Sequence, residues 1–363
     1  MKTYLVTGAA GFIGSNFVSY ILKNFTDIKI ISLDNLGYAG NLDNLKAWSN
    51  HAMHEFVRAD ICDAQAIRNV FNSTNIDVVV HFAAESHVDR SIEDPLTFVN
   101  TNVLGTATLL NAAKDAWGQS AKGGRAAANF AGHKFLHVST DEVYGSLGPE
   151  GFFTEDTPLD PHSPYSASKA ASDLLVKSYF DTYGFPINIT RCSNNYGPYQ
   201  FPEKLIPLMI ANAMAHKNLP VYGDGMNVRD WLYVEDHCRA IQMVISSGKL
   251  GEIYNIGGHN ECTNIDIVRQ IIGALSQKVD SSIDESLISF VEDRLGHDRR
   301  YAIDPAKISA EIGWEPATKF SDGLAKTIDW YLENQKWVQD IVCGEYKNYY
   351  DKMYGTRKQV QGE

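Results

Sequence analysis

Short apolar runs rich in β-branched residues alternate with longer stretches of helical character through residue 190. The expected strands are Tyr4–Thr7, Ile28–Leu33, Glu55–Ala59, Asp77–Phe82, Phe135–Ser139 and Ile187–Thr190. Alternation of this kind is typical of βαβ units, in which helices cover both faces of a parallel sheet. The pattern therefore predicts an α/β fold built on a doubly wound parallel sheet of the Rossmann type.

The pattern changes after residue 197, where the breaker cluster Gly197–Pro202 precedes an expected helix at Leu205–His216. The segments Arg229–Asp236 and Ile253–Ile256 are predicted to return to the first lobe. We therefore expect two lobes, a Rossmann lobe of residues 1–197 plus about 229–264 and a smaller α/β lobe of about 198–228 plus 265–345. The cleft between two lobes is the natural place for a substrate.

Composition narrows the class of protein. The 363 residues are 44% hydrophobic and carry a formal net charge of −12 without a Lys/Arg-rich tract, so we expect no nucleic-acid partner. The five cysteines are scattered and lack Cys-x-x-Cys spacing, which favours reduced thiols in a cytoplasmic protein over disulfides or zinc. No apolar run approaches the length of a membrane span. The Gly/Ala-rich segment Gly118–His133 is expected to be a surface loop.

A glycine-rich turn follows the first expected strand. Gly8, Gly11 and Gly14 open a helix, where backbone N–H groups can approach a pyrophosphate. Asp34 closes the second strand, and a carboxylate there binds ribose hydroxyls and repels a 2′-phosphate, which predicts NAD rather than NADP. Asp60 ends the third strand and is either a partner of the adenine amine or a helix N-cap.

Two acids, Asp141 and Glu142, follow the fifth strand. Ligands of open α/β sheets bind at the carboxyl ends of the strands, where these acids could donate and remove protons. A bare Asp-Glu pair is more often a solvated loop, so the context decides its meaning. Tyr165 and Lys169 lie four residues apart at the start of an expected helix, Ser166–Tyr183, and so share one helix face. A nearby cation lowers the pKa of a tyrosine base.

Together these motifs resemble the extended short-chain dehydrogenase/reductase family, most of all those members that dehydrate a nucleotide-linked hexose. The likeness spans about residues 1–325. The matching stretches, besides the glycine turn and Asp34, are Phe82–Arg90, Ser139–Gly145, Tyr165–Lys169, Arg191–Gly197, Pro202–Pro207, Arg229–Asp236 and Asp293–Tyr301.

The resemblance implies roles for five residues. Tyr165 takes a proton from the 4-hydroxyl of the sugar, supported by Lys169, while Thr140 donates a hydrogen bond to the same oxygen. Glu142 then removes the proton on carbon 5, and Asp141 protonates the departing 6-hydroxyl. NAD accepts the hydride from carbon 4 and returns it to carbon 6. The resemblance also implies that Asp141 begins neutral and Glu142 ionised.

The resemblance further assigns two sets of binding residues. Those expected to contact NAD are Gly8, Gly11, Phe12, Ile13, Gly14, Asp34, Asn35, Asp60, Ile61, Phe82, Ala83, Ala84, Glu85, Ser86, Thr101, Tyr165, Lys169 and Asn195. Those expected to line the sugar nucleotide are Ser86, Thr140, Asn194, Lys204, Leu205, Tyr222, Arg229, Asn264, Arg294 and His297. Arg229 and Arg294 would meet the diphosphate, for which a guanidinium fork is suited. A homodimer is implied through the helix of Tyr165 and a helix near Thr97–Ala113.

Alternatives remain at this point. The expected substrate is dTDP-glucose, but UDP- or CDP-sugars fit the same motifs. A 4-epimerase or decarboxylase would share Tyr165 and Lys169 without needing an acid pair after Thr140. A binding-only NAD sensor would typically lack the tyrosine or the lysine. His81 and His87 flank apolar residues near Asp89, where packing is favoured over a metal site, and we expect no metal.

Overall fold

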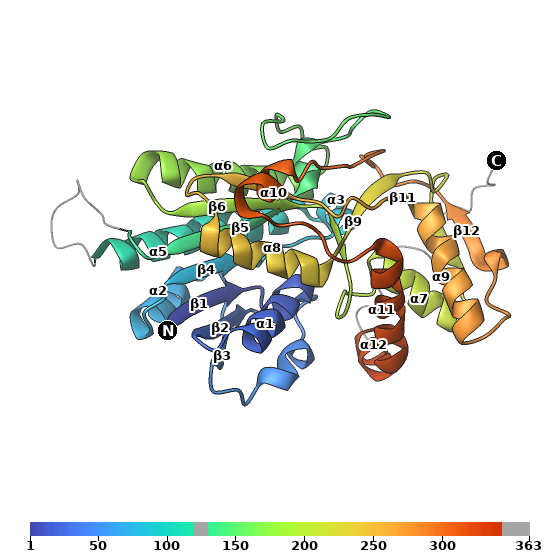
Figure 1. Ribbon diagram of the computed structural model, residues 1–363, viewed down its shortest axis with the longest axis horizontal. Helices are drawn as coiled ribbons and strands as arrows, with labels where there is room; N and C mark the ends of the chain where they lie inside the picture. Colours follow the sequence, from blue (N-terminus) through green and yellow to red (C-terminus); the bar gives the residue numbers. More distant parts are fainter. Residues whose placement is uncertain (120–129, 343–363) are drawn as a thin grey trace.

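The computed structural model describes residues 1–119 and 130–342, and its larger lobe is organised around a parallel sheet of seven strands (Figure 1). The sheet order is β10 (Ile253–Ile256), β6 (Ile187–Cys192), β5 (Lys134–Thr140), β4 (Val78–His81), β1 (Lys2–Thr7), β2 (Ile28–Asp34) and β3 (His54–Arg58). All six neighbouring pairs are parallel. The predicted doubly wound sheet is therefore confirmed, and each strand predicted before residue 190 ends within two residues of its expected bounds.

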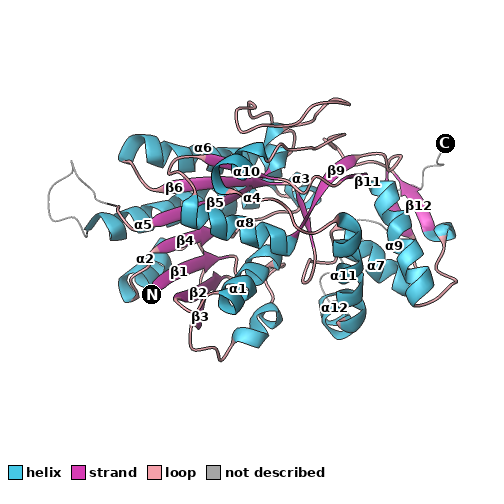
Figure 2. Ribbon diagram, viewed as in Figure 1, coloured by secondary structure: helices cyan, strands magenta, loops and turns pink. Residues whose placement is uncertain are grey.

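Helices cover both faces of this sheet (Figure 2). One face carries α1 (Phe12–Asn24), η1 (Leu42–Trp48), α8 (Val234–Ser247) and α10 (Ala306–Ile312), and the other carries α2 (Ala64–Ser73), α5 (Thr106–Gln119) and α6 (Pro164–Tyr183). The period-two alternation of a strand explains the two cores, because Tyr4 and Val6 of β1 join the first and Leu5 joins the second.

Short helical turns connect the sheet to the cleft. After β4 the chain forms α3 (Val88–Glu93), α4 (Pro95–Phe98) and a π-helical turn, η2 (Val99–Gly105), that leads into α5. After β5 it forms the 3₁₀ turn η3 (Asp141–Tyr144). Helix α6 begins two residues before its predicted start, because Ser163 and Ser166 form a capping box and Pro164 takes a first-turn position. It ends, as expected, at Gly184 in the left-handed conformation.

The smaller lobe has its own apolar core. Its elements are α7 (Leu205–Met214), α9 (Asn264–Lys278), α11 (Phe320–Glu333), α12 (Gln335–Val342), η4 (Glu285–Leu287) and the paired strands β8 (Leu219–Tyr222) and β12 (Ile288–Val291). A three-stranded sheet of β11 (Glu261–Thr263), β9 (Val228–Tyr233) and β7 (Asn194–Tyr196) lies at the junction of the lobes.

Some segments of the chain belong to a different lobe, or to both lobes, compared with the predicted division. Strand β9 is not part of the seven-stranded sheet: its Trp231 packs in the smaller core and its Leu232 in the larger. Ile308 and Trp314, expected in the smaller lobe, are fully buried in the larger core. Their side chains pack in the same core as residues of α8. Burial of this apolar surface explains why the chain returns to the larger lobe after β12. Of the predicted loop Gly118–His133, residues 118–119 end α5 and residues 120–129 lie outside the described part of the chain, as do residues 343–345.

Candidate functional site

The glycine turn leads into the N-terminus of α1. Gly8 has a φ of +67°, and a Cβ on Gly14 would lie 2.2 Å from the Gly8 carbonyl oxygen, so this tight approach requires glycine. Gly11 is the N-cap and provides no side-chain acceptor for the first-turn N–H groups. These groups and the positive end of the helix can therefore receive an anion such as a pyrophosphate.

Asp34 lies at the end of β2, beside this turn. Its carboxylate is buried and accepts hydrogen bonds from the backbone N–H groups of Ala10 (3.0 Å) and Leu36 (2.8 Å). Burial raises the pKa of Asp34, and the two backbone bonds oppose that rise. A Cβ on Gly40 would lie 2.7 Å from the same carboxylate, so the chain between Asp34 and Gly40 folds tightly against it.

A single large cleft contains 17 of the 18 residues expected to contact NAD. They are Gly8, Gly11, Phe12, Ile13, Gly14, Asp34, Asn35, Ile61, Phe82, Ala83, Ala84, Glu85, Ser86, Thr101, Tyr165, Lys169 and Asn195. The cleft runs from the glycine turn to the ends of β4 and β5, and combines backbone donors, a buried acid and apolar walls. These features fit a dinucleotide.

Asp60 is the exception, since it does not line the cleft. Its carboxylate accepts a hydrogen bond from the backbone N–H of Cys62 (2.8 Å) and one from the Asn35 amide (3.3 Å). The alternative interpretation of Asp60 as a helix N-cap is wrong, because Asp63 caps α2 by accepting from the N–H groups of Gln65 and Ala66. The two acids lie three residues apart, and only the one next to the helix can reach its first turn.

Tyr165 and Lys169 lie on the first turns of α6, and both side chains are buried at the cleft. Lys169 donates a hydrogen bond from Nζ to the carbonyl oxygen of Val138 (2.8 Å). Burial lowers the pKa of Lys169 to about 8. Burial, with Glu142 next in importance, raises the pKa of Tyr165 well above its ordinary value. The phenol therefore needs additional positive charge before it can act as a base at neutral pH.

Asp141 and Glu142 form the first turn of η3, directly after β5. The Thr140 hydroxyl accepts a hydrogen bond from the Glu142 N–H (3.3 Å) and donates one to the Asp141 carboxylate (3.2 Å). Burial and the neighbouring Glu142 raise the pKa of Asp141 well above its usual range. Burial also raises the pKa of Glu142, but there cations oppose it, first Arg294 and then Lys204. The pKa of Asp141 is thus raised more strongly than that of Glu142, which favours Asp141 as the partner that keeps its proton.

Three cations, Lys204, Arg229 and Arg294, surround Glu142 on the substrate side, and we call them the cleft cations. Within residues 1–119 and 130–342, none of them forms an ion pair with a carboxylate. The buried Arg294 Nε lacks a hydrogen-bond partner in that same part of the chain. Lys204 donates to the backbone carbonyl of Ser86 (3.0 Å). Arg229 is buried, and Lys204 and Arg294 are half-buried. Three cations around one carboxylate leave an excess of positive charge, which an anion from outside the chain can neutralise.

All ten residues expected to line the sugar nucleotide border the same connected space. Ser86, Thr140, Asn194 and Lys204 line the cofactor part of the cleft. Asn194, Lys204, Leu205, Tyr222, Arg229, Asn264, Arg294 and His297 line a second part, and Glu142 borders both. The structure thus brings these residues together from both lobes, beside the acid pair.

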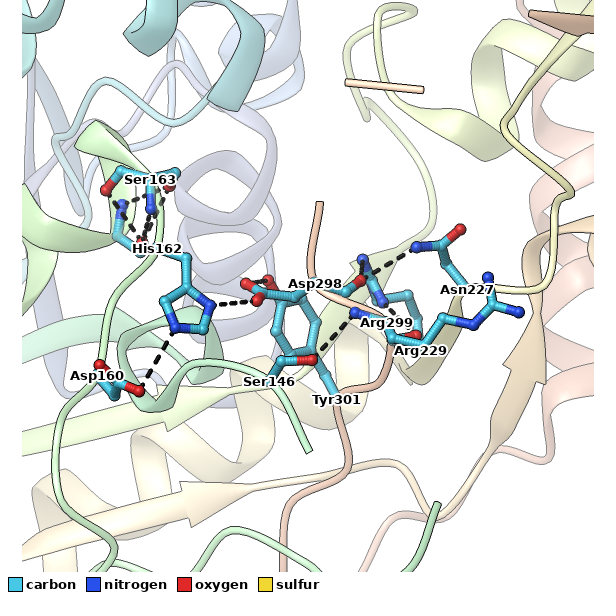
Figure 3. A network of polar contacts seen from close by, with 10 residues as sticks. Ser146, Asp160, His162, Ser163, Asn227, Arg229, Asp298, Arg299 and Tyr301 are labelled. Atoms are coloured by element: carbon cyan, nitrogen blue, oxygen red, sulfur yellow. Dashed lines mark hydrogen bonds and ion pairs between the residues drawn. The ribbon is translucent and has the colours of Figure 1, made fainter. Parts of the chain in front are cut away.

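A polar network centred on Asp298 fixes Arg229 (Figure 3). The backbone carbonyl of Asp298 accepts a hydrogen bond from the Arg229 guanidinium (2.8 Å), which stacks on the Tyr301 ring at 4.2 Å. The Asp298 carboxylate accepts from the Tyr301 hydroxyl (2.6 Å) and contacts Nδ1 of His162 (2.6 Å). His162 immediately precedes Ser163, the N-cap of α6, so this network joins the substrate side to the helix of Tyr165.

Several lining residues were missed by the sequence interpretation. The turn 37–40 lines the cofactor part of the cleft, and its glycines, Gly37 and Gly40, lie close enough to Asp34 to have indicated a tight turn there. Glu203, which lines both parts, precedes the predicted Lys204. Tyr301 also lines the substrate part, but no local pattern marks an aromatic ring that packs under an arginine distant in sequence.

The two histidines near Asp89 occupy different sites. His81 is buried in the larger lobe, where its ring contacts the hydroxyl groups of Thr7 (2.7 Å) and Thr106 (2.9 Å). His87 lies at the substrate part of the cleft. Among the residues that the structure describes, no three His, Cys, Asp or Glu side chains are grouped as metal ligands.

The fold and the cleft are those of an extended short-chain dehydrogenase/reductase. The family model for GDP-mannose 4,6 dehydratase matches residues 5–327. The chain therefore belongs to the GDP-mannose 4,6 dehydratase family. Among the relatives, the dTDP-glucose 4,6-dehydratase of Xanthomonas campestris pv. campestris is 54% identical over 350 residues, which are 96% of this chain and 98% of the relative. That of Salmonella typhimurium is 50% identical, over 98% of this chain and 99% of its own.

Solved structures give the same result. The dTDP-glucose 4,6-dehydratase of Bacillus anthracis, in complex with NAD, superposes with a TM-score of 0.83 at 48% identity, covering 94% of this chain and 100% of that one. The Streptomyces venezuelae enzyme, with NAD and TYD bound, has a TM-score of 0.85 at 46% identity over 93% and 99%. A UDP-glucose 4-epimerase from Thermus thermophilus, also with NAD, has a TM-score of 0.79 at 28% identity over 92% and 99%.

Proposed function

We propose that the protein is an NAD-dependent hydro-lyase that converts dTDP-glucose to dTDP-4-keto-6-deoxyglucose. One observation carries the proposal: two adjacent acids, Asp141 and Glu142, have opposite charge environments and lie at the same cleft as Tyr165. Elimination of water needs one group that gives a proton and one that takes it, and a neutral acid beside a carboxylate supplies both.

NAD is the proposed cofactor. The glycine turn, the buried Asp34 and the cleft that continues to Tyr165 support it, and the similar structures from Bacillus anthracis and Streptomyces venezuelae were solved with NAD. When bound, NAD would accept a hydride from carbon 4 of the sugar and later return it to carbon 6.

The residues of this chain would perform the remaining steps. Tyr165, which Lys169 supports, takes the proton of the 4-hydroxyl, and Thr140 donates a hydrogen bond to that oxygen. Glu142 removes the proton on carbon 5, which the 4-ketone acidifies. Asp141 then protonates the 6-hydroxyl as it leaves as water. The charges around the two acids support this division of roles, because a carboxylate raises the pKa of Asp141 further and cations oppose the rise at Glu142.

The cleft cations support a substrate that carries a diphosphate. Arg229 has a fixed orientation, since backbone carbonyl groups hold its guanidinium and Tyr301 packs against it. Arginine matches phosphate oxygens in a fork geometry, and burial strengthens such contacts. Thymidine as the base and glucose as the hexose follow the names of the relatives at 50–54% identity.

A 4-epimerase of UDP-sugars is the second candidate, because an epimerase structure superposes over most of the chain. That reaction needs the tyrosine and the lysine but no elimination. The acid pair in the cleft therefore favours dehydration.

We also propose a cytoplasmic homodimer. Exposed leucines support the dimer: Leu96 of α4, Leu104 of η2 and Leu174 of α6 are each more than half exposed, at 71%, 54% and 63%. Together they would bury apolar surface in a second copy. The four cysteines within the described residues are free, which supports a reducing compartment. No described helix has the length and apolar character needed to cross a bilayer. Sedimentation of the wild type and of Leu174→Glu tests the dimer, which the charged variant should weaken.

The activity is tested by incubating the purified protein with dTDP-, UDP- and CDP-glucose. We expect the alkali-dependent absorbance of a 4-keto sugar with dTDP-glucose, and slower or no turnover with the others. A 4-epimerised product without loss of water would support the second candidate. Absence of any keto product from all three nucleotides would falsify the dehydratase proposal.

A further inference from the structure

A second group of charges lies behind the catalytic residues, between α6 and the sheet. It consists of His137 on β5, Asp173 on α6 and Arg191 on β6, and we call it the Asp173 network. All three residues are at most 3% exposed. One Asp173 oxygen accepts from Arg191 Nε at 2.8 Å, and the other lies 3.4 Å from His137 Nε2. None of these residues lines the cleft, so the network contacts neither cofactor nor substrate.

Asp173 lies one helical turn after Lys169, on the same face of α6. Lys169 turns toward β5, where its Nζ donates to the carbonyl of Val138, the residue that follows His137. The titratable groups that interact with Lys169 come from four elements: His81 of β4, His137 of β5, Cys192 of β6 and Asp173 of α6. Asp173 is the one carboxylate among these groups.

We propose that Asp173 is a positioning residue for the reaction: its buried carboxylate, one helical turn from Lys169, keeps Lys169 protonated, and Arg191 and His137 lie against that carboxylate. A lysine removed from water loses its proton unless an opposite charge is near. Neutral Lys169 could no longer stabilise the phenolate of Tyr165. The reaction would then lose its base, although no group that touches the substrate had changed.

Electrostatics agrees with this geometry. Burial lowers the pKa of Lys169 to about 8, and Asp173 is the leading influence that opposes the fall. His137 and then Arg191 hold the pKa of Asp173 below its usual value despite complete burial, so its carboxylate is ionised. Both buried histidines have a lowered pKa, to about 4 for His137, and add no positive charge at neutral pH.

The test is a tyrosinate absorbance titration of the NAD-saturated protein, with the Tyr165→Phe spectrum subtracted. It compares the wild type with Asp173→Asn, with Asp173→Asn/Arg191→Gln and with Arg191→Lys. The double variant removes both charges and leaves no unpaired buried ion. We therefore expect it to fold even if the single variant does not. Arg191→Lys is the matched control, because it keeps Asp173 and a cation beside it.

We expect Asp173→Asn and the double variant to raise the Tyr165 midpoint by about one pH unit or more, and Arg191→Lys to leave it unchanged. With substrate, kcat at neutral pH should fall while KM is retained. A double variant that titrates like the wild type would overturn the proposal, because any effect of the single change would then come from unpaired Arg191. The inference rests on the proposed function for its effect on turnover, but the titration uses no sugar nucleotide. A failure to dehydrate dTDP-glucose is thus distinguishable from a failure of this inference.

Discussion

The Asp173 network and the cleft cations, the two groups of charge near Tyr165 and Glu142, differ in one respect. In the Asp173 network, carboxylate and guanidinium neutralise each other inside the protein. The cleft cations have no carboxylate partner within the described residues, and Arg294 even leaves a buried Nε without a hydrogen bond there. Both groups lie near α6 or η3, the elements that carry Tyr165, Lys169 and the acid pair. Their location therefore does not explain why one group is paired and the other is not.

The difference shows what each group is for. Removing one member of a paired buried set leaves an uncompensated charge, so the Asp173 network must be retained for the fold and for Lys169. Removing a cation that has no carboxylate partner should leave the free energy of unfolding unchanged or increase it. The same change should weaken binding of an anionic ligand. Mutations in the two groups should therefore have opposite effects on stability and binding.

The largest effect is expected at Glu142, the acid among the cleft cations. Glu142→Gln should lower kcat by about 10²- to 10⁴-fold, because a general base is lost from the elimination step. Oxidation at carbon 4 would still proceed, so NADH absorbance should accumulate on the protein. The exposed Glu150→Gln is the control, and normal turnover of Glu142→Gln would exclude this residue as the base.

Asp173→Asn should have the opposite signature. Loss of the carboxylate leaves Arg191 as an unpaired buried cation, which costs about 3–5 kcal/mol in the free energy of unfolding. Urea unfolding of the single variant and of Asp173→Asn/Arg191→Gln measures this, and the double variant should recover most of the loss. Equal stabilities of the single variant and the wild type would show that the network is not charge-coupled.

Arg294→Met tests the other side of the comparison. Affinity for dTDP, measured by calorimetry, should fall by about 2 kcal/mol, or about 30-fold, because the phosphate loses a buried partner. The free energy of unfolding without ligand should stay the same or increase. Arg299→Met is the matched control, since Arg299 is exposed and paired with exposed Asp224. If both variants bind dTDP equally well, the cleft cations do not hold the diphosphate.

The sequence located most residues that line the cofactor part of the cleft, because the information that places them is local. The glycine turn and Asp34 lie at strand ends, and each strand alternates its side chains between the two cores, so a pattern over a few residues determines their place. Tyr165 and Lys169 followed from a helical spacing of four. The acid pair could be located at the end of β5 for the same reason.

What the sequence could not provide depends on contacts between distant segments. Asp298 and Tyr301 act on Arg229 from about 70 residues away in sequence, through a backbone carbonyl and an aromatic ring. The Asp173 network joins three separate elements, and none of its members has a local motif. Asp60 is a case in which a local pattern was misleading. Asp60 and Asp63 are both suitable N-cap residues by type, but Asp63 caps α2 because it directly precedes the helix.

The smallest expected effect concerns His162, which links the cleft cations to α6 through Asp298. The hydrogen bond to Asp298 raises the pKa of His162, so its stabilising contribution is fully present below the unfolded value, near 6.5, and is lost as pH rises through the folded value. The His162 side chain is 41% exposed, and solvent screening limits the effect to a few tenths of a kcal/mol. Urea unfolding of wild type and His162→Gln should therefore differ most near pH 5.5 and converge by about pH 8. Asp160→Asn should keep most of this difference, because Asp160 is 80% exposed and ranks behind Asp298 as a cause. A difference that grows as pH rises would mean that neutral His162, and not its ion pair with Asp298, joins the two sides of the site.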